Sequence, residues 1–149
     1  MTELKVGDTA PDFSLLDERG LPLSLRDYLG RHVVILYFYP KDFTPGCTKE
    51  ACSFKDDFSE FEKRDVVILG VSYDEPEEHV KFRIRYSLPY ILLSDKDKRV
   101  SKIYGAEGVF TAKRITYIID KEGKIAALYP KVDVNIHSKE ILDSIDRLQ

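Results

Sequence analysis

The chain is organised around residues 40–52, PKDFTPGCTKEAC, which join a strand to a helix. The preceding residues 33–39, VVILYFY, form an unbroken apolar and β-branched run, which predicts a buried strand that ends at Pro40. Beyond this corner, apolar side chains recur at spacings of three and four, which predicts an amphipathic helix running to about Arg64. These side chains are Ala51, Phe54, Phe58 and Phe61. Helical projection places Cys47 on the same side, so a cysteine lies where the strand turns into the helix.

The start of such a helix stabilises an anion. Its first turn leaves backbone N–H groups unpaired and carries a partial positive charge. Thr44 fits the N-cap and Pro45 the first helical position, which places Cys47 about one turn in, where the free N–H groups point. From this corner alone, an inert buried cysteine is an equal alternative. The pattern Pro-x3-Thr-x2-Cys favours a reactive thiol instead.

That pattern, formed by Pro40, Thr44 and Cys47, resembles the active-site signature of the peroxiredoxins, which are thiol peroxidases with a thioredoxin-like fold. With Cys52 five residues further on, the segment is similar to the bacterioferritin comigratory protein branch, also called peroxiredoxin Q. The resemblance covers nearly the whole chain. Other stretches that resemble this branch are GDTAPDF at 7–13, LLSD at 92–95, and Arg114 leading into IID at 118–120.

The resemblance implies a reaction and a role for each residue. Cys47 would attack hydrogen peroxide or an alkyl hydroperoxide and become a sulfenic acid, and Cys52 would close an intramolecular disulfide. Thioredoxin or a similar dithiol would reduce this disulfide, and no cofactor is implied. Arg114 matches the family's active-site arginine, a fixed charge able to hold both sulfur and peroxide oxygen. Pro40 would shield the site, and the Thr44 hydroxyl is a candidate donor.

Glu50 follows Cys47 by three residues and lies on roughly the same side of the predicted helix, from which it could orient Arg114. A solvated carboxylate is the simpler expectation for a glutamate there. We therefore leave Glu50 out of the predicted site.

Two other functions are compatible with a reactive cysteine pair. A thiol–disulfide oxidoreductase on the same fold is one, but that chemistry uses Cys-x-x-Cys, whereas Cys47 and Cys52 are spaced Cys-x4-Cys. A redox sensor or a holdase chaperone, which would use the oxidation as a switch, is the other. Steady-state turnover separates these functions, since a sensor oxidises once and an enzyme many times.

Zinc binding is a competing use of cysteine. A zinc site needs four protein ligands, or three and a water. His32, His79 and His137 are scattered along the chain without ligand spacing. We therefore predict no metal site, and we expect these histidines at the surface or at the ends of elements.

Composition limits the remaining possibilities. The 149 residues include 23 Lys and Arg against 26 Asp and Glu, a net charge of −3 with both signs interspersed, which gives no sign of a nucleic-acid or membrane surface. The N-terminus lacks a basic start and an apolar core, so we expect a cytoplasmic protein. Two cysteines are too few for a secreted disulfide scaffold. We expect a monomer or a weak homodimer.

The remaining patterns predict an α/β fold. Residues 66–72, VVILGVS, form a second buried run, expected parallel to the first with the helix as crossover. Hairpins are expected at 12–25 and 115–129, a short strand at 90–93, a charged, exposed helix at 75–86, and further helical segments at 26–29, 98–104 and 138–148. Together with the resemblance, these patterns predict one thioredoxin-like domain over residues 1–149. Its mixed central sheet would be flanked by helices and carry an N-terminal hairpin.

Overall fold

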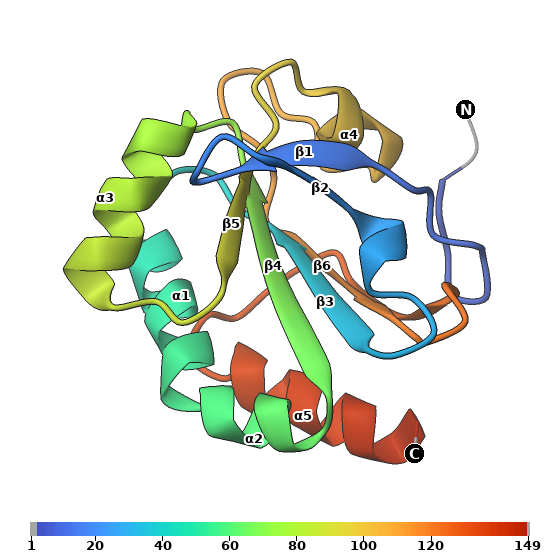
Figure 1. Cartoon of the computed structure of the whole chain (residues 1–149). Coiled ribbons are helices and arrows are strands. Elements are labelled where there is room, and N and C mark those ends of the chain that lie inside the picture. Colours follow the sequence, from blue (N-terminus) through green and yellow to red (C-terminus); the bar gives the residue numbers. More distant parts are fainter. Residues whose placement is uncertain (1–2, 149) are drawn as a thin grey trace.

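The computed structural model describes residues 3–148. One mixed sheet of seven strands, in the order β2-β1-β5-β4-β3-β6-β7, forms its centre, with helices on both faces (Figure 1). The strands are β1 (Ser14–Asp17), β2 (Pro22–Ser24), β3 (Val33–Phe38), β4 (Val66–Ser72), β5 (Ile91–Ser94), β6 (Ile115–Ile119) and β7 (Ile125–Tyr129). The helices are the 3-10 turn η1 (Leu25–Asp27), α1 (Pro45–Asp56), α2 (Phe58–Lys63), α3 (Pro76–Tyr86), α4 (Arg99–Ile103) and α5 (His137–Leu148).

The strand pairing confirms the predicted mixed sheet. β3, β4 and β5 are parallel neighbours, and β6 and β7 extend the sheet beyond β3 as an antiparallel hairpin. The N-terminal hairpin of β1 and β2 pairs antiparallel with β5 at the other edge. The continuous apolar runs at β3 and β4 fit this arrangement, because strands in the middle of a sheet covered by helices are buried on both faces.

The two faces of β3 pack into two separate cores. Val34, Leu36 and Phe38 face a cluster that includes residues of α4 and the N-terminal segment. Ile35 and Tyr37 face the other cluster, to which α1, α2, α3 and α5 contribute. Cys47 belongs to this second cluster, as the helical projection predicted. The helix that carries Cys47 therefore packs against the face of β3 formed by Ile35 and Tyr37.

Two local predictions were wrong. The helix predicted to run to about Arg64 breaks at Asp57, whose φ of −99° and ψ of 10° end α1 before α2 begins. The Asp57 carboxylate accepts a hydrogen bond of 2.5 Å from Ser138 on α5, and this tertiary contact accompanies the break. The helix at 75–86, predicted to be exposed, buries both His79 and Phe82 completely. Within residues 3–148, no helix combines the length and the apolar character that crossing a membrane requires.

Candidate active site

Cys47 lies in the first turn of α1 and is 1% exposed. Thr44 is the N-cap with an extended backbone and Pro45 opens the helix, as predicted. The Thr44 hydroxyl, however, donates to the Lys41 carbonyl at 2.7 Å and makes no capping bond to the helix. The first turn of α1 is therefore left without a side-chain cap.

Arg114 reaches the thiol from the residue before β6. Its Nη2 donates to Cys47 Sγ at 3.3 Å, and its Nη1 donates to Glu50 Oε1 at 2.6 Å. Gly46 allows this close approach, because a β-carbon built there would lie 3.1 Å from Arg114 Nη2. The guanidinium thus bridges a sulfur and a carboxylate that are both carried by α1. Such a planar, permanently charged group can hold two acceptors at once through its separate N–H donors.

Glu50 is buried at 1% exposure, so the expectation of a solvated carboxylate was wrong. Burial raises the pKa of Glu50 to about 7, and the neighbouring Arg114 opposes this shift. Glu50 Oε2 is buried and has no hydrogen-bond partner among residues 3–148. The i, i+3 spacing from Cys47 was the one signal that pointed to this contact, because it places both side chains on the same side of the helix.

Cys52 and Pro40 lie further from these contacts. Cys52 is a half-buried free thiol further along the same unbroken helix as Cys47. Pro40 is half-buried between the end of β3 and the corner. Arg114, by contrast, is in direct contact with both Cys47 and Glu50.

One histidine was predicted wrongly. His79 is 0% exposed and lies inside α3, whereas His137 is buried but begins α5, at the end of an element as predicted, and His32 remains partly accessible. Asp42, Asp74 and His79 offer potential metal-ligand atoms within 4.8 Å of one another. These atoms already bond to one another or to neighbouring protein groups, so the contacts describe a hydrogen-bond network.

Comparison with known proteins places this chain in a family. The model of the AhpC/TSA family matches residues 6–128. The chain belongs to the AhpC/TSA family. Relatives of this AhpC/TSA protein include the putative peroxiredoxin bcp of Coxiella burnetii, 48% identical over 93% of this chain and 97% of that protein. Peroxiredoxin Bcp of Bacillus subtilis is 40% identical over 95% of each chain, and chloroplastic peroxiredoxin Q of Arabidopsis thaliana is 47% identical over 83% of this chain and 58% of that one.

Solved structures agree with the sequence relatives. The peroxidoxin BcpB of Mycobacterium tuberculosis superposes with a TM-score of 0.93 at 33% identity and covers 99% of both chains. Xylella fastidiosa PrxQ, crystallised as a C47S mutant, reaches the same TM-score at 27% identity and covers 99% of both chains. The AhpC/TSA protein therefore has the thioredoxin-like fold of the peroxiredoxins, and it is a thiol peroxidase that acts on a peroxide and is restored by a thiol reductant.

Proposed function

We propose that Cys47 is the peroxide-reducing thiol of this enzyme. Its thiolate attacks one peroxide oxygen, the O–O bond breaks, Cys47 becomes a sulfenic acid, and the leaving oxygen takes up a proton to give water or an alcohol. The observation that carries this proposal is the 3.3 Å contact between Arg114 Nη2 and Cys47 Sγ in the first turn of α1. The same guanidinium can stabilise the negative charge that develops on the leaving oxygen.

Thr44 and Pro40 complete the proposed site. Because the Thr44 hydroxyl hydrogen is already donated to the Lys41 carbonyl, its oxygen is free to accept a hydrogen bond from the peroxide O–H. Pro40 offers the site an apolar ring without a backbone N–H, and we assign it the role of shielding the sulfur. The Glu50 carboxylate orients the Arg114 guanidinium through the 2.6 Å ion pair.

Cys52 is the proposed resolving thiol. It condenses with the Cys47 sulfenic acid to form an intramolecular disulfide and release water. A dithiol reductant such as thioredoxin then restores both thiols by exchange and is itself oxidised to a disulfide. The Xanthomonas campestris bacterioferritin comigratory protein, 29% identical to this chain, has alkyl peroxide reduction activity. We extend the substrate class here to hydrogen peroxide and alkyl hydroperoxides.

The setting of the reaction is also part of this proposal. We propose a single domain over residues 1–149 that acts in the cytoplasm as a monomer or weak homodimer. The interspersed surface charge and the net charge of −3 support a role without nucleic acid. Sedimentation of the reduced and oxidised protein measures the oligomeric state.

Peroxide consumption coupled to thioredoxin and its reductase tests the proposal. Wild type should turn over many times, Cys47→Ser should consume no peroxide, and Cys52→Ser should still form a trappable sulfenic acid at a near-normal rate. Loss of the first oxidation step in Cys52→Ser alone would reverse the two assignments. A single oxidation without turnover would favour the redox-sensor function instead.

A further inference from the structure

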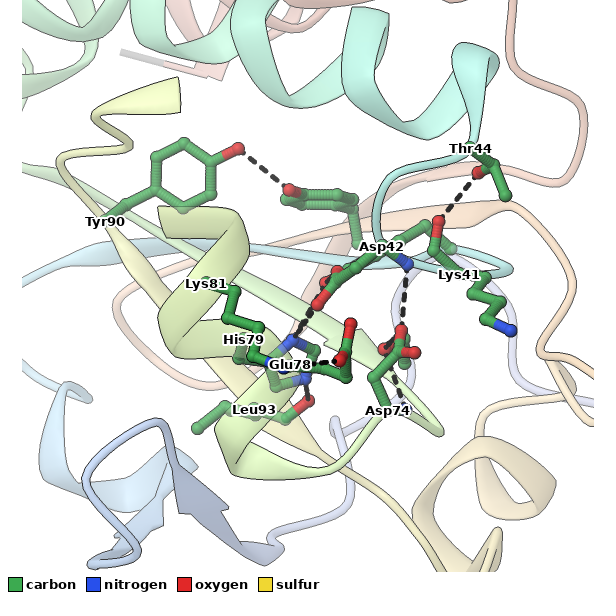
Figure 2. Close-up of polar contacts among 12 residues, drawn as sticks. Lys41, Asp42, Thr44, Asp74, Glu78, His79, Lys81, Tyr90 and Leu93 are labelled. Carbon is green, nitrogen blue, oxygen red and sulfur yellow. Dashed lines mark hydrogen bonds and ion pairs between the residues drawn. The ribbon is translucent and has the colours of Figure 1, made fainter. Parts of the chain in front are cut away.

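A second polar cluster lies directly before the reactive corner. Asp42, in the turn between β3 and α1, accepts a hydrogen bond from the Tyr39 hydroxyl at 2.5 Å and lies 2.6 Å from His79 Nδ1 (Figure 2). His79 belongs to α3, and its Nε2 lies 3.1 Å from the Leu93 carbonyl of β5. Asp42, His79 and Tyr39 are all essentially inaccessible to solvent. The mechanism proposed above uses none of them.

The geometry fixes how many protons the pair holds. A carbonyl oxygen only accepts, so His79 Nε2 must carry a hydrogen that it donates to Leu93. Two acceptors cannot face each other at 2.6 Å, so one further proton lies between His79 Nδ1 and Asp42 Oδ2. Whichever atom holds that proton, the pair is neutral overall. A buried neutral pair whose hydrogen bonds are satisfied avoids the large cost of an unpaired buried charge.

The pair acts on the turn 40–44, which leads into α1. The Asp42 N–H donates to Asp74 Oδ2 at 2.9 Å, so both the backbone and the side chain of Asp42 are held by neighbouring elements. Phe43 follows with φ of 68°, a left-handed conformation that is uncommon for a bulky residue. Such backbone strain persists only where the surroundings impose it. Thr44, the N-cap of α1, is the next residue.

We propose that the Asp42–His79 pair is a positioning element for the attack of Cys47 on peroxide. By anchoring the turn 40–44 to α3, it sets where Thr44 and the first N–H groups of α1 lie around the sulfur. This inference rests on the proposed function and adds two residues to it. Neither residue contacts the sulfur, so each acts through the position of the turn.

Asparagine at position 42 offers a matched test. In Asp42→Asn, the amide oxygen accepts from Tyr39, and the amide N–H donates to Nδ1 of a neutral His79 whose Nε2 still donates to Leu93. The hydrogen bond between residue 42 and His79, which anchors the turn 40–44 to α3, is kept, and the shared proton is replaced by a fixed amide hydrogen. Asp42→Ala removes this anchoring hydrogen bond. Asp95→Ala is the control, because Asp95 is another fully buried aspartate, and its carboxylate caps α4 instead of the turn 40–44.

The test is run in a Cys52→Ser background, where Cys47 is the one remaining cysteine of the sequence. It compares two reactions of Cys47 in a single turnover: oxidation by hydrogen peroxide and alkylation by monobromobimane. Alkylation needs the thiolate but no donors placed around a peroxide. Asp42→Ala should lose at least about tenfold in the peroxide rate constant, since displacements of about 1 Å can cost up to 10²-fold. Its alkylation rate should stay within about threefold of wild type. Asp42→Asn and Asp95→Ala should keep both rates within about threefold.

Equal peroxide rates in Asp42→Ala and wild type would overturn the inference, as would equal losses in Asp42→Asn and Asp42→Ala. Should Asp42→Ala fail to fold, Asp42→Asn/His79→Leu takes its place, because it breaks the anchor without leaving a buried charge. A peroxide loss in that double variant relative to Asp42→Asn supports the inference, and an unchanged rate contradicts it. A wild-type Cys47 that does not react with peroxide would overturn the proposed function itself, together with this inference.

Discussion

Disulfide formation requires α1 to open. Residues five apart on an ideal α-helix have Cα atoms about 8.6 Å apart, whereas a disulfide needs less than about 7 Å. Cys47 and Cys52 both lie in α1, which is unbroken from Pro45 to Asp56. We therefore expect residues 44–54 to unwind when the bridge forms, which would expose Phe54, now 0% exposed.

The Tyr90 hydroxyl opposes this opening. It donates to the Ala51 carbonyl at 3.1 Å and lies 2.8 Å from the Tyr37 hydroxyl. Because the Ala51 carbonyl only accepts, the Tyr90 hydrogen goes there, and Tyr37 must donate to the Tyr90 oxygen. Tyr90→Phe therefore removes one hydrogen bond to α1. While α1 stays closed, the substitution also leaves the buried Tyr37 hydroxyl without its acceptor.

The expected magnitude follows from these two bonds. A hydrogen bond contributes about 1 kcal/mol net to stability, and a buried hydroxyl without a hydrogen-bond partner costs about 1–3 kcal/mol. Opening lets water reach both groups, so the two contributions together should favour the open helix in Tyr90→Phe by about 2–4 kcal/mol, a factor of about 30–900 in the opening equilibrium. If opening precedes bridge formation, the rate of disulfide formation rises by the same factor. Oxidation of Cys47 itself should be unchanged.

Quenched flow with mass spectrometry suits this measurement, because the chain has no tryptophan to report by fluorescence. The sulfenic acid and the disulfide differ by one water in mass, so both steps are followed in one experiment. Tyr117→Phe is the control, since its buried hydroxyl donates to the Tyr104 carbonyl and belongs to the opposite core. A wild-type rate of disulfide formation in Tyr90→Phe would refute the idea that the hydrogen bond from Tyr90 to Ala51 opposes the opening of α1. Equal hydrogen-exchange protection of 44–54 in the reduced and oxidised proteins would refute the opening.

Three further predictions concern the contacts of Cys47. Arg114→Lys keeps the charge but loses the planar fork, so stopped-flow kinetics should show a loss of at least about tenfold, or about 1.4 kcal/mol, in the peroxide step; unchanged kinetics would show that the fork of Arg114 does not contribute to this step. Gly46→Ala should slow the same step several-fold, because its β-carbon would lie 3.1 Å from Arg114 Nη2, while thermal unfolding should show stability unchanged or raised by up to about 1 kcal/mol. Burial raises the pKa of Glu50 from 4.5 to about 7, so the folded state holds this proton more tightly and the free energy of unfolding should fall with rising pH across that window, by up to about 1.4 kcal/mol per pH unit. Urea titrations of Glu50→Gln should lack this part of the slope, and an identical slope in both proteins would show that Glu50 does not titrate there.

Apolar periodicity predicted the sheet and the position of the cysteine. The runs at 33–39 and 66–72 became the parallel neighbours β3 and β4, because continuous apolar strands are stable only with both faces covered. The same periodicity could not predict the break at Asp57, since Phe58 and Phe61 continue the helical spacing across it. The contact that accompanies the break joins Asp57 to Ser138, 81 residues away. Local patterns carry no information about such a partner.

The polar residues that sequence reasoning misplaced share a physical property. Buried aspartates such as Asp17 and Asp95 accept hydrogen bonds from backbone N–H groups two to six residues further along the chain, so short-range turn and capping rules account for them. Glu50 and His79 are paired instead with Arg114 and Asp42, which lie 64 and 37 residues away.

A buried ionisable group is costly unless a partner is brought to it, so each of these distant pairings needs the surrounding fold to hold it in place. Glu50 holds the guanidinium that contacts Cys47, and His79 holds the turn that leads to it. Residues that contradict local expectation are often found at functional sites, where stability is given up for geometry. On this reasoning, the two misplaced residues are the ones whose substitution should separate peroxide reactivity from folding most clearly.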